Sequence, residues 1–130
     1  MPGPIVRFDQ HSIEAVIPDE GAYPAFVHSV KERVSERGNA TIQVVYDVLD
    51  VDPAWDRVSE YFVVSCLNPR AVAIGQRRLF SLCRACGLVP GEGDEVDLGQ
   101  LVGRGLELRL GHETFEQRTR LRVLAHHRQP

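Results

Sequence analysis

The stretch from Asn68 to Gly87 constrains the fold more than any other part of the chain, because the residues at both of its ends are typical of helix ends. Asn68 can accept hydrogen bonds from the free amides of a first helical turn, and Pro69 suits the first helical position. Gly87 can adopt the left-handed conformation that ends many helices. The sequence therefore predicts one helix over residues 68–87.

This helix is expected to have an apolar face and a basic face. Arg70, Arg77 and Arg84 recur every seven residues, close to two full turns, so they align on one side. The apolar residues recur at three-and-four spacing, which predicts a stripe that packs on a core. The stripe consists of Ala71, Val72, Gly75, Leu79, Leu82, Cys83 and Cys86.

The rest of the chain has patterns typical of strands. Residues 23–37 suit either a helix or a strand, but the turn signal at 37–40 and the β-branched run at 40–51 favour a long hairpin. Further strands are expected at 57–66, 105–111 and 118–127, with loops at 50–55 and 88–103 and a turn at 111–117. Residues 1–21, rich in Pro and Gly, are interpreted as an N-terminal arm, and residues 22–130 as a single domain.

The resulting order, β-β-β-α-β-β, is that of the OB-fold, a five-stranded barrel that binds oligonucleotides or oligosaccharides. We therefore predict a mainly β domain with one helix and an OB-fold-like five-stranded barrel. Other α+β arrangements share this order and stay open. A chain of 130 residues with 43% hydrophobic and 25% charged residues suits one soluble domain, and no apolar stretch is long enough to span a membrane. No secretory signal is recognised, so a cytoplasmic protein is expected.

Charge is unevenly distributed along the chain, although the formal net charge is only −3. Residues 66–88 contain four Arg and no acid, whereas residues 92–97 form an acidic loop whose role is open. Charge alone therefore does not decide whether the partner is a polyanion.

Two groups of residues suggest metal or redox chemistry without meeting its requirements. Cys83 and Cys86 lie at the C-terminal end of the predicted helix, where the dipole opposes thiolate formation, and no zinc-ligand spacing accompanies them. We interpret them as reduced core thiols. The acidic loop around Pro53 fits a solvated turn better than a metal site. Its aspartates are Asp47, Asp50, Asp52 and Asp56. No catalytic residue, metal site or cofactor is expected, and the protein is predicted not to be an enzyme.

A row of arginines in the last strand is the most informative candidate site. Alternate residues share one face of a strand, so Arg118, Arg120 and Arg122 would lie about 7 Å apart, comparable with successive phosphates of an extended single strand. Aromatic side chains nearby would stack on bases. The full candidate set for nucleic-acid binding is Arg118, Arg120, Arg122, Arg109, Arg33, Lys31, Tyr61, Phe115 and Trp55. A solvated sheet face is the competing interpretation.

The segment LNPRAVAIGQRRLFSLCRACGL resembles the helix of a phage and prophage family of unknown function, which carries an N-P-x-A-V-x-I-x-x-R-x-L-x-x-x-C-x-A-x-G run. Residues on both sides fit its flanks, so the likeness covers most of the chain. They are Pro18, Gly21, Tyr23, Leu101, Gly103 and Leu106. Members of the family look like OB-fold single-stranded-DNA-binding proteins and are often encoded near phage DNA replication and DNA recombination genes.

From these observations we expect a non-enzymatic protein that binds single-stranded DNA in phage-type replication or recombination. The alternative is a protein–protein interaction module that recruits a replication or recombination protein through the same face. No membrane partner is expected, and homo-oligomer formation stays open.

Overall fold

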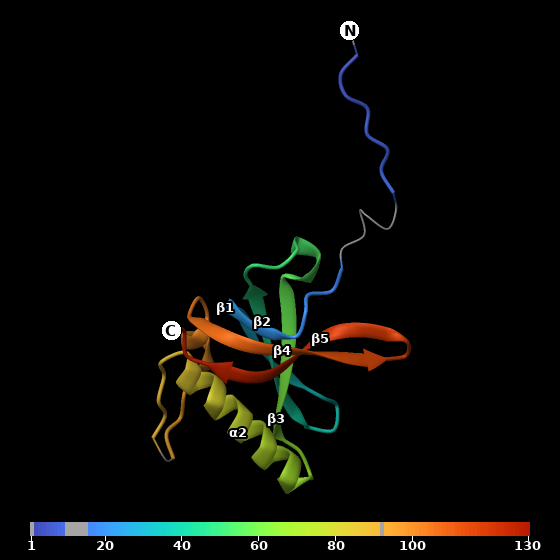
Figure 1. Ribbon diagram of the computed structural model, residues 1–130. Helices are drawn as coiled ribbons and strands as arrows, with labels where there is room; N and C mark the ends of the chain where they lie inside the picture. The colour runs from blue at the N-terminus through green and yellow to red at the C-terminus, as the bar shows by residue number, and fades with distance from the viewer. Residues whose placement is uncertain (1, 10–15, 92) are drawn as a thin grey trace.

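The computed structural model describes residues 2–9, 16–91 and 93–130, which contain a five-stranded sheet and one α-helix (Figure 1). The mainly β class with one helix is therefore confirmed. Two short 3-10 helices, at Pro53–Trp55 and Leu98–Leu101, lie in the connections. The main elements follow in the order β1 (Gly21–Val34), β2 (Ala40–Val48), β3 (Arg57–Ser65), α2 (Pro69–Ala85), β4 (Gly105–Phe115) and β5 (Arg118–His127).

The strands pair antiparallel in the order β3-β2-β1-β4-β5, so β1 is the central strand and β3 and β5 are the two edges. In the central pairings, Val30 of β1 lies opposite Val44 of β2, and Tyr23 lies opposite Leu108 of β4. In the part of the chain that the structure describes, β3 and β5 exchange no ladder of backbone hydrogen bonds. The sheet is open, so the OB-fold-like barrel expected from the element order is not confirmed.

The core follows from strict alternation along the strands. Leu106, Leu108 and Leu110 of β4 are fully buried, as the sequence predicts. Ile42, Val44, Tyr46 and Val48 of β2 also point inward. The loop predicted at 88–103 departs from expectation, because its 3-10 helix Leu98–Leu101 brings Leu101 into the core.

The helix α2 begins and ends where the sequence predicts. The Asn68 side chain accepts hydrogen bonds from the amides of Arg70 and Ala71, at 3.0 and 3.3 Å, and Gly87 ends the helix with a φ of 82°. Gly75 lies directly against β3: a Cβ at this position would come within 1.9 Å of the carbonyl oxygen of Val63. The missing side chain therefore lets the helix approach β3 closely. No helix within the described residues is long and apolar enough to cross a membrane.

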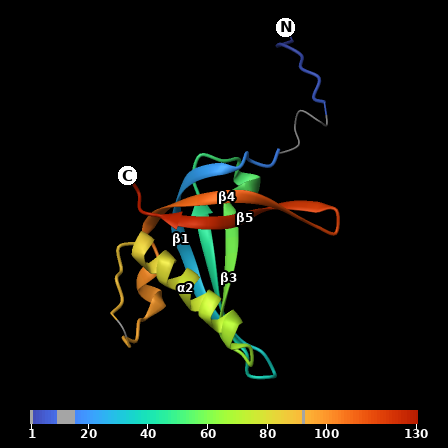
Figure 2. The ribbon, with the colours of Figure 1, turned by 60° about the horizontal axis from the view of Figure 1, so that its bottom comes forward.

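The β4–β5 hairpin is longer than predicted and projects beyond the rest of the sheet (Figures 1 and 2). Strand β4 continues to Phe115 instead of ending at Gly111, so Phe115 closes a strand and does not lie in a loop. The turn consists of Glu116 and Gln117, both with positive φ, at 49° and 64°. Such turns usually contain Gly, Asn or Asp, which explains why the sequence pattern predicted a longer turn over 111–117.

Candidate nucleic-acid interface

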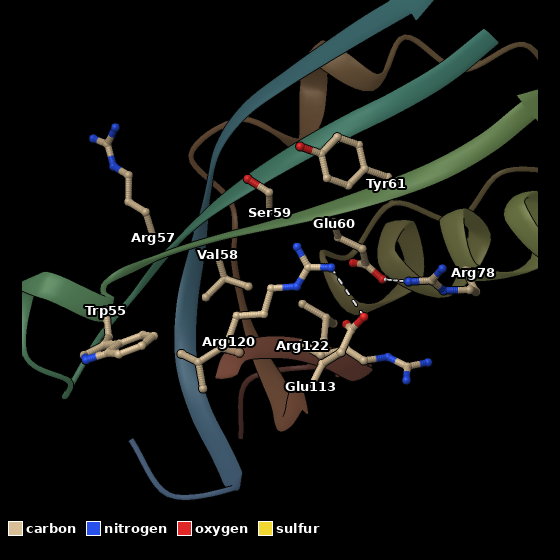
Figure 3. A pocket seen from close by; sticks show the side chains of 12 residues that line it. Trp55, Arg57, Val58, Ser59, Glu60, Tyr61, Arg78, Glu113, Arg120 and Arg122 are labelled. Atoms are coloured by element: carbon tan, nitrogen blue, oxygen red, sulfur yellow. Dashed lines mark hydrogen bonds and ion pairs between the residues drawn. The ribbon is translucent and has the colours of Figure 1, made fainter. Parts of the chain in front are cut away.

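A groove of about 420 Å³ lies where β3 and β5 fail to pair (Figure 3). Trp55 lies at one end of it and Arg78 at the other, with Arg120 between them. Four of its lining residues belong to the set predicted from the sequence, namely Trp55, Tyr61, Arg120 and Arg122. The others are Arg57, Val58, Ser59, Glu60, Arg78, Glu113, Leu121 and Val123.

A buried carboxylate links β3, β5 and the helix at one end of this groove. Glu60 of β3 is only 4% exposed. Its Oε1 accepts a hydrogen bond from the Tyr46 hydroxyl at 2.6 Å and lies 2.7 Å from Nε2 of His126 in β5. Its Oε2 accepts a hydrogen bond from the Arg78 guanidinium of α2. Because a buried carboxylate is costly without partners, these contacts make Glu60 the polar centre of the junction.

Aromatic packing strengthens the same junction, which we call the Glu60 cluster and define as Tyr46, Glu60, Phe62, Arg78 and His126. The rings of Phe62 and His126 stack with centroids 6.2 Å apart, and the Arg78 guanidinium lies 5.2 Å from the Phe62 centroid. Burial, with the neighbouring Glu60 charge, raises the pKa of Tyr46 well above its usual value, so this phenol stays protonated and donates.

His126 lies near the C-terminal end of β5, yet its side chain points into the molecule. Its side chain is only 4% exposed, and Nδ1 lies 3.3 Å from the Ser81 hydroxyl of α2. The pairing of β4 with β5 shifts between Arg109 and Leu110, which leaves Leu124 as an extra residue in β5. This β-bulge changes which residues point inward and directs His126 toward Glu60.

The groove arginines differ in how they are paired. Arg78 is bound to Glu60, Arg120 lies 3.4 Å from Glu113, and Arg57 lies 3.2 Å from Asp47. Arg122 forms no ion pair within the described residues. The Arg120 and Arg57 pairs are exposed and therefore weak, so their guanidinium groups remain exchangeable toward an anionic ligand.

The aromatic side chains frame the groove. Trp55 is half-buried, and its Nε1 is a buried donor without a hydrogen-bond partner among the described residues. Tyr61 is 54% exposed, and its hydroxyl accepts a 3.1 Å hydrogen bond from Gln43. Gln43 in turn accepts a 2.9 Å hydrogen bond from Arg33. Because the Nε1 atom is itself buried, Trp55 offers the groove the surface of its ring and not a hydrogen-bond donor.

The remaining predicted residues lie outside this groove. Arg118 and Phe115 face each other across the tip of the β4–β5 hairpin, in a separate pocket that also includes Arg120. Lys31 and Arg33 lie on β1, opposite Gln43 and Thr41 of β2, on the outer side of the β1–β2 hairpin. Arg109 lies on β4, opposite Ala125. The structure therefore divides the predicted set among several surfaces.

The cysteines of α2 are buried within the core, as predicted, and they are free thiols. Burial raises the pKa of Cys83, and it raises the pKa of Cys86 to about 11. Among the described residues, no three His, Cys, Asp or Glu side chains gather as a metal site would require.

The sequence contains a signal for two of three cluster residues that were not predicted as site residues, namely Glu60 and Arg78 but not His126. Glu60 alternates with Val58 and Phe62, so the strand pattern places it on the inner face. Arg78 lies three residues after Gly75, on the side of α2 that packs on β3. The burial of His126 depends on the bulge at Leu124, for which no local signal was recognised.

No family model matches the chain, and no curated protein matches it.

Proposed function

We propose that this domain binds single-stranded DNA in the groove between β3 and β5, without catalysing a reaction. The observation that carries the proposal is the combination of four guanidinium groups and two aromatic side chains in one groove. Proteins that bind single strands without sequence preference combine a basic groove with aromatic stacking platforms. The guanidinium groups belong to Arg57, Arg78, Arg120 and Arg122, and the aromatic rings to Trp55 and Tyr61.

The strand arrangement supports an OB-like fold. With β1 between β2 and β4, and the helix between β3 and β4 in sequence, the order agrees with the five-stranded Greek-key barrel of OB-folds, which can be partly open. We infer an OB-like barrel in which the Glu60 cluster joins β3 to β5 by side chains. Beyond the cluster, β3 and β5 stay apart, and the gap between them is the proposed path of the single-stranded DNA.

Each groove element has a role in the proposal. Arg122, without an ion pair in the described part of the chain, binds a phosphate directly, while Arg120 exchanges its exposed contact with Glu113 for a phosphate oxygen. Trp55 stacks on a base with the ring surface that lines the groove. Arg78 stays with Glu60 and contributes to the shape of the groove.

The biological setting belongs to the proposal as well. A role in phage or prophage DNA replication or recombination is supported by the likeness of the helix segment and by the groove chemistry. The alternative is a module that recruits a replication or recombination protein through the same edges, since unpaired strand edges can accept an added strand from a partner.

Titration of intrinsic fluorescence with oligo-dT tests the proposal, because Trp55 is the only tryptophan of the chain. We expect quenching at about 50 mM salt, and log affinity that falls with log salt by about 0.7 per phosphate contact. Replacing both Arg120 and Arg122 by Gln should reduce the slope by about 1.4 while leaving the domain folded.

The matched control is Arg109→Gln, which removes a guanidinium from β4 outside the groove. Equal loss of affinity in the control and the double variant would indicate a diffuse basic surface instead of this groove. Absence of any binding by the wild-type protein at about 50 mM salt would favour the partner-recruiting alternative.

A further inference from the structure

A second groove, of about 500 Å³, lies between the last turns of α2 and the end of β5. Both ribbon views show the end of β5 and the C-terminus beside the last turns of α2 (Figures 1 and 2). Its basic and aromatic lining residues are Arg77, Phe80, Arg84, His126, His127 and Arg128.

The electrostatics of this second groove differ from those of the first. None of its lining residues is acidic, and no ion pair involves Arg77, Arg84 or Arg128 among the residues that the structure describes. Three uncompensated guanidinium groups therefore line one concave surface of a chain whose formal net charge is −3. Such a local concentration of positive charge attracts an anion despite the overall charge.

The groove also offers an aromatic surface. Phe80 is 42% exposed although it is a large apolar side chain. The Arg84 guanidinium lies 5.9 Å from the centre of its ring. The guanidinium can bind a phosphate, and the exposed ring can stack on a base. This combination is expected of a surface that binds single-stranded nucleic acid.

The two grooves follow one another along β5, with the Glu60 cluster between them. Arg120 and Arg122 line the first groove, while His126, His127 and Arg128 line the second. On α2, the neighbouring residues Arg78 and Arg77 belong to the first and second groove respectively. From Arg120 to Arg128 an extended chain covers roughly 26 Å, at about 3.3 Å per residue.

We propose that single-stranded DNA leaves the groove between β3 and β5 and continues over the last turns of α2, where Arg77, Arg84 and Arg128 bind its phosphates. This inference rests on the proposed function and extends its site. The Glu60 cluster lies between the two grooves and holds them in one fixed path. The complete path needs an oligonucleotide longer than the first groove alone accommodates.

An experiment with two oligonucleotide lengths tests this path. We compare dT4 and dT12, using Trp55 quenching as the signal of the first groove and fluorescence anisotropy of labelled dT12 as the signal of the whole path. The double variant Arg84→Gln with Arg128→Gln should lose roughly tenfold or more in dT12 affinity at about 50 mM salt, and its salt slope should fall by about 1.4. Quenching of Trp55 by dT4 should stay unchanged.

The control is Arg70→Gln, an exposed arginine on the same helix that lines neither groove. It should leave both signals unchanged, and circular dichroism should show that all variants keep the wild-type fold. If the double variant binds dT12 with wild-type affinity and slope while Trp55 is still quenched, the second groove is not on the path and only the first groove remains. If the wild-type protein quenches with neither oligonucleotide and binds no dT12, the proposed function fails and the extended path with it.

Discussion

The two ends of the gap between β3 and β5 are held in different ways. At the closed end, the Glu60 cluster joins the strands through buried side chains, and each oxygen of the Glu60 carboxylate has a partner. At the open end, the Trp55 ring lines the groove, and the Arg120–Glu113 pair is exposed. The difference shows that side chains can fix the distance between two edge strands at one end. At the other end they leave a groove whose exposed guanidinium groups can still bind a ligand.

The largest effect is expected where the helix meets the closed end. Gly75→Ala places a Cβ within 1.9 Å of the Val63 carbonyl oxygen, and a backbone atom cannot move aside as a flexible side chain can. We expect the free energy of unfolding to fall by more than about 3 kcal/mol, at or beyond the upper end of the usual range for overpacking.

Urea denaturation measures this effect, with Gln76→Ala as the control because Gln76 is the exposed neighbour. The control should stay within about 0.5 kcal/mol of the wild type. A Gly75→Ala protein of wild-type stability would mean that the helix does not lie this close to β3.

The second prediction compares the two Arg–Glu pairs that line the same groove. Glu60→Ala leaves Tyr46 and His126 buried without their partner and should cost about 3 kcal/mol, toward the lower end for a broken buried pair because Arg78 is 43% exposed. Glu113→Ala removes the exposed partner of Arg120 and should cost less than about 1 kcal/mol.

Denaturant midpoints of the two variants, measured side by side, decide whether the pair at the closed end contributes more to the free energy of unfolding. Equal losses would contradict the contrast between the two ends. Binding measurements sharpen it further, because Glu113→Ala releases Arg120 and should strengthen binding of oligo-dT.

The smallest effect concerns the alkaline stability of the core beside the closed end. Burial raises the pKa of Cys86 to about 11, from 9.0 for an unperturbed thiol. Because the folded state retains this proton more strongly, the stabilisation is complete below pH 9 and is lost as the pH rises from about 9 to about 11. The loss should be on the order of 2 kcal/mol.

Unfolding free energies measured at pH 8 and pH 11 test this prediction. In Cys86→Ala the alkaline loss should shrink, whereas Cys66→Ala, which changes a half-buried thiol outside α2, should behave as the wild type. Identical pH profiles for all three proteins would show that the Cys86 thiol does not contribute.

Local patterns predicted much of the fold, because helix caps and strand alternation depend only on residues that are close in the sequence. Asn68 and Gly87 mark the helix because capping depends on the adjacent turn, and the alternation of Leu106, Leu108 and Leu110 marks a half-buried strand in the same way. The pattern also places Glu60 on the inner face, although its partners lie far away in the sequence.

The tertiary structure decided what depends on register and on distant partners. An extra residue at Leu124 shifts the pairing of β5 and turns His126 inward, and no local pattern states how strands will align. The sequence also left undecided whether β3 and β5 pair with each other, because strand order alone does not fix the distance between two edge strands. The sequence by itself therefore determined the elements, their faces and a row of arginines; only the packing of β3, β5 and α2 brought Trp55, Arg120 and Arg122 into one groove.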